Sequence, residues 1–362
     1  MNTPLPCALR ILCLALLLLP LGFATADEPV PGAVDSAAPP SDVPTARLPL
    51  NRRIGVGIIR AAFNREGART RRAMAAHLPA VPVTSVEGLS YRAGDPDALL
   101  DIHYPASAAS TDARLPVLIW IHGGAWLSGS RQDAAPLFRL LAAEGYAVVA
   151  PDYSLAPAAV YPQPLRQLSE LHAWLERHAG DYPIDPERLF LAGDSAGAQL
   201  AAQLAAMGSN PAYAAEVGLP PVFTPRVLRG VVLQCAVLDL PALVRRERGG
   251  SRLFGWGTGT TVLAYAGTRD PGSPVLAQMS PVLHLTADFP PVWITGGNAD
   301  PLTAGHSVAF AARLEALAVP VTSLFWPDDH APGLPHLYPF DLDSEEGQVA
   351  FRSMLEFLRS RE

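Results

Sequence analysis

The chain has 362 residues, of which 49% are hydrophobic and 17% charged, and its formal net charge at pH 7 is −7. This length and apolar content suit one large globular domain, with or without a cap. All 27 basic residues are arginines. An acidic balance without a basic face argues against nucleic acid as the main partner.

The amino terminus predicts an export signal. Arg10 precedes an apolar run over residues 11–24 that is too short to span a bilayer comfortably, and Ala24-Thr25-Ala26 has the small–x–small pattern of a signal-peptidase site. We therefore expect a signal peptide over 1–26, cleavage after Ala26 and a periplasmic or secreted protein. An uncleaved membrane anchor is the alternative. After cleavage only Cys235 would remain of the 3 cysteines, which excludes an intramolecular disulfide.

The next segment changes composition twice. Residues 27–50 are rich in Pro, Ala, Ser and Asp and predict a flexible linker. Residues 51–84 predict a helical cap segment, and its stretch 52–72 carries seven arginines against the single acid Glu66. Such a stretch would suit peripheral contact with an anionic membrane or cell-envelope polymer. A solvated amphipathic helix that caps the domain is the simpler interpretation, and we favour it.

From residue 85 onward, short apolar runs alternate with helix-forming runs. The expected strands are 86–92, 99–104, 117–121, 147–150, 188–192, 230–234, 292–295 and 321–326. The expected helices are 134–144, 165–178, 196–207, 303–318 and 345–359. This alternation predicts an α/β fold with a mainly parallel, eight-stranded sheet covered by helices on both faces.

One stretch breaks the alternation. Residues 239–290 are rich in Gly and Pro and predict an insertion over the sheet edge, where selectivity for a ligand would reside. Trp126, Trp256 and Tyr265 would shape a pocket there or simply pack in the core.

A nucleophilic serine is predicted by Gly193-Asp194-Ser195-Ala196-Gly197, which lies between an expected strand and an expected helix. A serine on a sharp strand-to-helix turn exposes its Oγ and points the first helical N–H groups at a developing oxyanion. The glycines are needed because side chains at their positions would clash in so tight a turn. A second Gly pair, in His122-Gly123-Gly124-Ala125-Trp126, follows a central strand. Gly123, Gly124 and Ala196 are therefore the expected oxyanion donors.

Serine also needs a base and an acid that orients the base. Asp300 lies on the turn that leaves the expected strand 292–295, although it would equally N-cap the following helix beside Pro301. The next loop contains His330 and His336, of which one at most is expected to be the base. His330 follows its strand more closely, and His336 is nearer the last helix. The prolines between them prevent a zinc-protease helix, so no metal is expected.

At this point the motifs resemble a family. The His122-Gly123-Gly124-Ala125-Trp126 loop, Asp152-Tyr153-Ser154-Leu155-Ala156-Pro157, the Ser195 pentapeptide and the Gly297…Asp300 turn are similar to those of α/β-hydrolase carboxylesterases of the hormone-sensitive-lipase and feruloyl-esterase-like type. The likeness covers roughly residues 85–360. It departs from the usual pattern at Ala125, where the third glycine normally stands, and in having two histidines in the late loop.

The resemblance implies an α/β-hydrolase domain over 51–362 and a Ser195/Asp300/His336 triad that forms an acyl-enzyme without a cofactor. The Pro-His-x-aromatic pattern around His336 resembles the family more than that around His330, so we favour His336. Asp152 and Tyr153 would brace the active-site loops. The expected substrate is a small carboxylic ester with a short acyl group. A peptidase or amidase of the same fold and a non-catalytic binding protein are the alternatives.

Overall fold

The structure is a computed structural model, and it describes residues 48–111, 114–247 and 252–362. The predicted signal peptide and nearly all of the predicted linker lie outside these ranges. Within the described ranges, no helix has the length and apolar character required to cross a membrane. Helix α2 (Leu50–Met74) begins at the last residue assigned to the linker.

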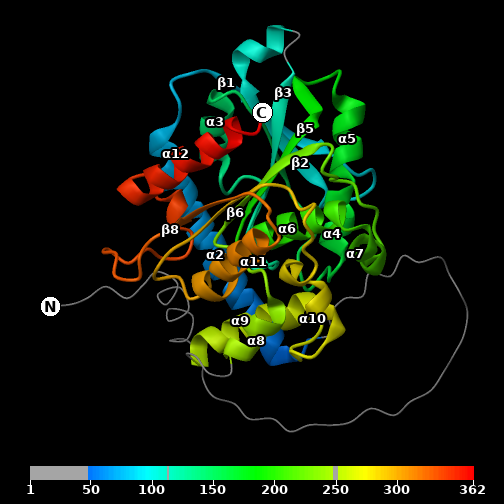
Figure 1. Cartoon of the computed structure of the whole chain (residues 1–362), viewed down its shortest axis with the longest axis vertical. Coiled ribbons are helices and arrows are strands. Elements are labelled where there is room, and N and C mark those ends of the chain that lie inside the picture. Colours follow the sequence, from blue (N-terminus) through cyan, green and yellow to red (C-terminus); the bar gives the residue numbers. More distant parts are fainter. Residues whose placement is uncertain (1–47, 112–113, 248–251) are drawn as a thin grey trace, which may run out of the picture.

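An eight-stranded sheet forms the centre of the molecule, in the order β1-β2-β4-β3-β5-β6-β7-β8 (Figure 1). Strands β1 and β2 are antiparallel to their neighbours and all other neighbours are parallel, which confirms the predicted fold class. The strands are β1 (Val83–Ser90), β2 (Leu99–Pro105), β3 (Leu115–Ile121), β4 (Ala147–Pro151), β5 (Ile184–Asp194), β6 (Leu228–Gln234), β7 (Val292–Gly296) and β8 (Val321–Phe325).

Apolar side chains alternate between the two faces of the central strands, because successive residues of a strand point to opposite sides. On β3, Val117 and Ile119 join one core cluster, and Leu118 and Trp120 join the other. Helices α3 (Ala135–Ala143) and α12 (Glu345–Arg359) cover the second face. The first face is covered by α4 (Gln163–Ser169), α5 (Leu171–His178), α6 (Ala196–Ser209), α7 (Pro211–Val217) and α11 (Ala309–Ala316).

Two expected helices differ in detail. The run 165–178 forms two helices, α4 and α5, that meet at Glu170. The run 303–318 begins as a π-helical segment, Thr303–Val308, before α11. A π segment widens one turn, and such segments are frequent beside functional sites. Here it begins three residues after Asp300.

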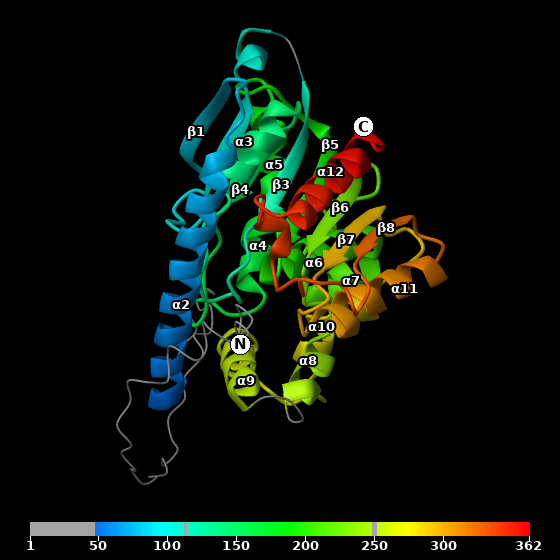
Figure 2. The same cartoon turned by 90° about the vertical axis from the view of Figure 1, so that its left-hand side faces the viewer.

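Helices also occupy the stretch 239–290, which contains α8 (Leu240–Glu247), α9 (Arg252–Ala266) and α10 (Pro274–Gln278). Helix α2 runs along the outside of the molecule, from α9 at its beginning to α3 and β1 at its end (Figure 2). Gly55 allows this approach, since a Cβ there would contact the Trp256 ring at 2.8 Å. Helices α8 and α9 and the beginning of α2 thus lie beyond the carboxyl edge of the parallel strands.

Candidate active site

Ser195 occupies the turn between β5 and α6, with a positive φ of 51° and ψ −115°. A non-glycine residue rarely adopts positive φ, so the surrounding structure must hold it there. The chain after β3 crosses directly above this turn, and a Cβ at Gly197 would clash with the carbonyl oxygens of Ile121 and His122. The Gly-x-Ser-x-Gly spacing therefore reflects backbone crowding at a strained serine.

Three of the predicted residues meet at this point. The Ser195 Oγ lies 3.0 Å from His336 Nε2, and His336 Nδ1 lies 2.6 Å from Asp300 Oδ2. The other oxygen of Asp300 accepts the N–H of Leu302 at 2.9 Å, which fixes the carboxylate. The Asp300 side chain is 1% exposed and that of His336 is 20% exposed. This arrangement suits proton transfer from the serine to an oriented imidazole.

Burial and charge act in opposite directions on these two groups. Burial alone would raise the pKa of Asp300, but the His336 charge, their hydrogen bond and the Leu302 N–H together lower it. Burial would likewise lower the pKa of His336, yet the Asp300 charge and hydrogen bond, helped by the Asp194 charge, raise it. The pair therefore favours a carboxylate beside an imidazole of increased basicity.

His330, the other candidate base, is held elsewhere. Its Nε2 lies 2.9 Å from Glu346 Oε1 on α12, and its ring packs against Trp326 with centroids 4.4 Å apart. The Asn298 side chain donates to the His330 carbonyl at 3.0 Å. His330 thus fastens the late loop to α12 and to the turn that carries Asp300, whereas His336 bonds to Ser195.

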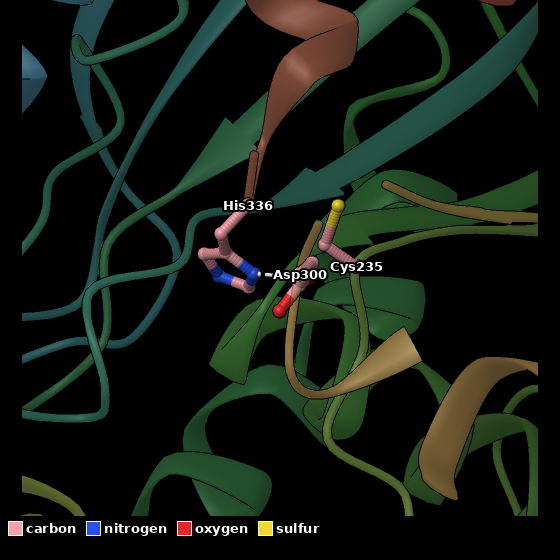
Figure 3. Close-up of side chains that lie close together, drawn as sticks. All are labelled: Cys235, Asp300 and His336. Carbon is pink, nitrogen blue, oxygen red and sulfur yellow. Dashed lines mark hydrogen bonds and ion pairs between the residues drawn. The ribbon is translucent and has the colours of Figure 1, made fainter. Parts of the chain in front are cut away.

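A buried cysteine lies beside the Asp300–His336 pair. Figure 3 shows Cys235, Asp300 and His336 reaching one point from three separate segments, and their ligand atoms lie within 4.8 Å of one another. Such atoms could in principle hold a metal ion. However, His336 Nδ1 and Asp300 Oδ2 already bond to each other, and the Leu337 N–H donates to Cys235 Sγ at 3.3 Å. A cation would have to displace both interactions, so the contacts fit a positioning role for the thiol.

The loop after β3 has an unusual backbone. Gly124, Ala125 and Trp126 all have positive φ, of 104°, 54° and 59°. The turn is closed by the N–H groups of Leu127 and Ser128, which both donate to the Gly124 carbonyl at 3.1 Å. Ala125 thus occupies a left-handed position where the related motif has glycine. This conformation costs an L-residue about 1 kcal/mol.

Two side chains brace this loop. The Tyr153 hydroxyl donates to the His122 carbonyl at 2.9 Å, and its ring stacks on the His122 imidazole with centroids 4.3 Å apart. Asp152 accepts the Arg131 N–H at 2.6 Å and pairs with the Arg131 guanidinium, which also donates to Asp101 at 2.7 Å. These contacts match the bracing that the resemblance implies for Asp152 and Tyr153.

Sequence reasoning gave no role to Asp194, which lies next to Ser195 and is buried. Its Oδ1 accepts the Trp120 indole N–H at 3.2 Å. Burial raises the pKa of Asp194 to about 6, although the Trp120 bond and the charges of His122 and His336 oppose the shift. In the sequence, Asp194 could have been noticed as the one acidic residue in the turn between the apolar strand and the apolar helix.

A cavity of about 650 Å³ opens over Ser195. Ala125, Trp126, Ala196 and His336 line it, and Ala196 is the first residue of α6, whose N–H has no intrahelical partner. The predicted donors Gly123 and Gly124 precede Ala125 in the same loop. Of these three loop residues, Ala125, which sequence reasoning did not select as a donor, is the one that lines the cavity.

The three pocket aromatics have different positions. Trp126 lines the cavity, and its indole N–H donates to Gln199 Oε1 on α6 at 3.0 Å. Tyr265 stacks on Trp126 with centroids 5.1 Å apart, and Trp256 packs against Gly55 of α2. Trp256 and Tyr265 therefore act as packing residues.

Sequence reasoning missed the part that α2 plays. Residues from Ile59 to Ala73 of this helix line the cavity. Its arginines also make internal contacts: Arg60 donates to the carbonyls of Leu127 at 2.7 Å and Ala156 at 2.8 Å, and Arg52 donates to Thr260 at 2.6 Å. Two of the seven arginines thus join the helix to the rest of the domain.

Comparison with known proteins agrees with this geometry. A family model described as the alpha/beta hydrolase fold matches residues 118–332, which is more than half of the chain. The chain belongs to this family. The resemblance drawn from the motifs is therefore confirmed.

The sequence relatives include several esterases. An esterase of Gibberella moniliformis is 30% identical over 220 residues, covering 59% of this chain and 65% of that protein. Esterase LipQ of Mycobacterium tuberculosis is 28% identical over 269 residues, covering 72% of this chain and 61% of that protein. The chain thus spans slightly less than two thirds of the length of these curated relatives.

Solved structures share the fold. Esterase B from Lactobacillus rhamnosis superimposes with a TM-score of 0.71 at 23% identity, covering 85% of this chain and 96% of that one. An esterase from Pyrobaculum calidifontis gives a TM-score of 0.65 at 23% identity, covering 86% of this chain and 98% of that one. These structural matches support the same α/β-hydrolase architecture.

Proposed function

We propose that the protein is a serine carboxylesterase that cleaves small carboxylic esters through an acyl-enzyme. The observation that carries this proposal is the continuous contact from Ser195 Oγ through His336 to Asp300 at the floor of an open cavity. The names of the esterase relatives support the same reaction class.

In the first half of the reaction, Ser195 Oγ attacks the ester carbonyl while His336 Nε2 takes its proton. Asp300 keeps the other imidazole nitrogen protonated and stabilises the imidazolium. The oxyanion is stabilised by the N–H groups of Ala196, Gly123 and Gly124, with that of Ala125 as a further donor. His336 then returns the proton to the leaving alcohol, and water resolves the acyl-enzyme by the same route. Loss of one oxyanion donor typically costs about 2.7–4 kcal/mol of transition-state stabilisation.

The first test is an intact-mass measurement of purified protein treated with a fluorophosphonate probe. We expect one adduct on the wild type and none on Ser195→Ala, together with loss of p-nitrophenyl acetate turnover in the variant. A correctly folded wild type that neither forms the adduct nor hydrolyses the ester would contradict the proposal and favour a non-catalytic scaffold. Faster cleavage of a matched p-nitroanilide than of the ester would favour an amidase.

We also propose export with cleavage after Ala26, on the basis of the sequence alone. The mass of protein isolated with its native leader, from a host that exports it, tests this directly. A mature chain that begins at residue 27 supports export by cleavage. A full-length chain that fractionates with membranes would favour the uncleaved anchor. Binding of the cleaved form to anionic vesicles would then test peripheral envelope contact through residues 52–72.

A further inference from the structure

The active-site cavity follows one face of α2. Ile59, Phe63, Glu66, Thr70 and Ala73 all line it, and their spacing of four, three, four and three residues places them on a single side of the helix. At about 1.5 Å per residue, this face extends for roughly 21 Å. The cavity is therefore an elongated groove with α2 as one wall.

The two ends of this wall face different parts of the molecule. At the start of α2, Arg52 donates to Thr260 on α9 at 2.6 Å. At its end, Met74 packs in the same cluster as Phe340, and beyond the helix His77 lies 2.9 Å from Asp343. The first half of α2 thus faces α9, and the second half faces the segment that follows His336. Figure 2 shows the same course, with α9 beside the lower end of α2.

The polarity of the groove changes along this direction. We define the apolar arm as the end between α2, α8 and α9, which is lined by Ile59, Phe63, Val237, Leu243 and Phe254. We define the polar arm as the end between α2 and the segment after His336. Ala73, Leu337, Tyr338 and Phe340 also line this end, and its polar groups come from Glu66, Arg69, Thr70, Asp341, Ser344 and Glu346. Ser195 lines the groove as well.

The position of His336 orients an ester in this groove. In the proposed reaction, His336 donates its proton to the leaving oxygen, so the alcohol part must depart on the His336 side. The segment that carries His336 continues into the polar arm. The acyl part then extends away from His336, toward α8 and α9.

We propose, on the basis of the proposed function, that the preferred substrates join a medium-length apolar acyl group to a neutral, hydroxyl-bearing alcohol such as a polyol. The acyl chain occupies the apolar arm and the alcohol occupies the polar arm. Burial of each additional methylene in the apolar arm should raise kcat/KM by about fourfold until the arm is filled.

The existing contacts of the polar arm, together with its hydroxyl groups, favour a neutral alcohol over a cationic one. Glu66 pairs with Arg69 at 3.4 Å, and Glu346 pairs with His330 at 2.9 Å. Two of the three carboxylates therefore already contact a partner side chain, the Arg69 guanidinium or the His330 imidazole. Their remaining lone pairs, together with the Thr70 and Ser344 hydroxyls, suit hydrogen bonds with alcohol hydroxyls.

Two constitutional isomers test the orientation. Glyceryl monohexanoate has an apolar acyl group and a polar alcohol, whereas hexyl glycerate has the same atoms with the ester reversed. We expect kcat/KM for the first to exceed that for the second at least tenfold, after each value is divided by the rate of hydroxide-catalysed hydrolysis. This correction is needed because the hydroxyl groups of the glycerate activate its carbonyl. Equal values, or a preference for hexyl glycerate, would overturn the proposal.

Variants locate the effect in the apolar arm. In Phe63→Ser, the ratio of kcat/KM for glyceryl hexanoate to that for glyceryl acetate should fall at least fivefold. The ratio is independent of the fraction of folded enzyme. The matched control is Ile54→Ser, because Ile54 lies on the same helix but is 47% exposed, and its ratio should equal that of the wild type. An unchanged ratio in Phe63→Ser would place the acyl chain elsewhere and overturn the assignment.

A cationic ester tests whether the polar arm recognises the alcohol by hydrogen bonds or by charge. Choline hexanoate should be a poorer substrate than glyceryl hexanoate, and a clear preference for it would show recognition by charge and overturn the neutral-alcohol assignment. Turnover of p-nitrophenyl acetate is measured on the same enzyme. If that ester is cleaved but the isomer preference fails, only this inference is lost. If neither is cleaved, the proposed function itself is contradicted.

Discussion

The loops at the carboxyl edge of the sheet and the wall formed by α2 are held in place by different kinds of contact. In the loops the backbone itself is packed tightly, as where Gly197 lies under the carbonyl oxygens of Ile121 and His122. The wall is attached mainly through long side chains, such as Arg60 to the Leu127 and Ala156 carbonyls. Changes in the loops should therefore alter the chemistry, whereas changes in the wall should alter selectivity and stability.

The sharpest test of the loops at the carboxyl edge compares His336 with His330. His336→Ala removes the group that contacts Ser195, so we expect kcat for p-nitrophenyl acetate to fall by about 10⁴-fold or more. His330→Ala breaks the bond to Glu346 and should reduce kcat by less than tenfold, with its main effect on the free energy of unfolding. Steady-state kinetics and urea denaturation of both variants measure this contrast. The opposite pattern would assign the base to His330.

Asp300→Asn tests how the acid acts on the base. We expect kcat to fall by about 10³–10⁴-fold, because an amide neither holds the required tautomer nor stabilises the imidazolium. The pH profile should change as well. Only neutral His336 accepts the proton, so kcat/KM rises with pH through the raised pKa of His336, above 6.5. Without the Asp300 charge, the opposing effect of burial weighs more, and the midpoint should move to lower pH. An unchanged midpoint would contradict the electrostatic role.

Short motifs were sufficient to predict most of the residues in the loops at the carboxyl edge of the sheet. Ser195 and Asp300 each follow a buried apolar strand, and the carboxyl ends of parallel strands meet at one edge. The histidine could not be chosen from spacing alone. His336 is directed by its neighbour Leu337, which adopts φ 62° and donates its N–H to Cys235 Sγ from a distant segment. That contact exists only in the folded chain.

The wall was less predictable for a physical reason. The sequence prediction for residues 52–72 rests on their overall charge, which treats every arginine as solvated. In the structure, Arg60 turns inward to two carbonyl oxygens, and the neighbouring Ile59 and Phe63 face the cavity. The covered side of this arginine-rich helix depends on where α8 and α9 pack over the site. A local sequence pattern does not specify that position.

Arg60→Met probes the attachment of the wall. The variant loses two hydrogen bonds from a guanidinium and leaves the Leu127 and Ala156 carbonyls without that donor, so we expect the free energy of unfolding to fall by about 2–4 kcal/mol. Because Leu127 belongs to the loop after β3, kcat should also fall, by several-fold. Urea denaturation and steady-state kinetics measure both effects. Arg65→Met is the matched control, since Arg65 lies on the same helix and is exposed. Equal losses in the two variants would indicate a general effect of charge.

In the loops at the carboxyl edge, Asp194→Asn should change the free energy of unfolding and the activity in opposite directions. Burial raises the pKa of Asp194 to about 6 from an ordinary value of 3.8, so the folded protein binds this proton more tightly than the unfolded chain. Ionisation therefore costs stability as the pH rises from 4 to 6, and the full cost, about 2–3 kcal/mol, applies above pH 6.

The asparagine variant should accordingly be more stable than the wild type at pH 8 and nearly equal to it at pH 4. The Asp194 charge also helps to raise the pKa of His336, so the variant should lose activity modestly and shift its acid limb to lower pH. Urea titrations at the two pH values provide the measurement. A stability difference that is the same at both would mean that Asp194 ionises freely, and its contact with Trp120 would then be purely structural. The expected result would instead identify a carboxylate whose burial destabilises the fold while its charge supports the base.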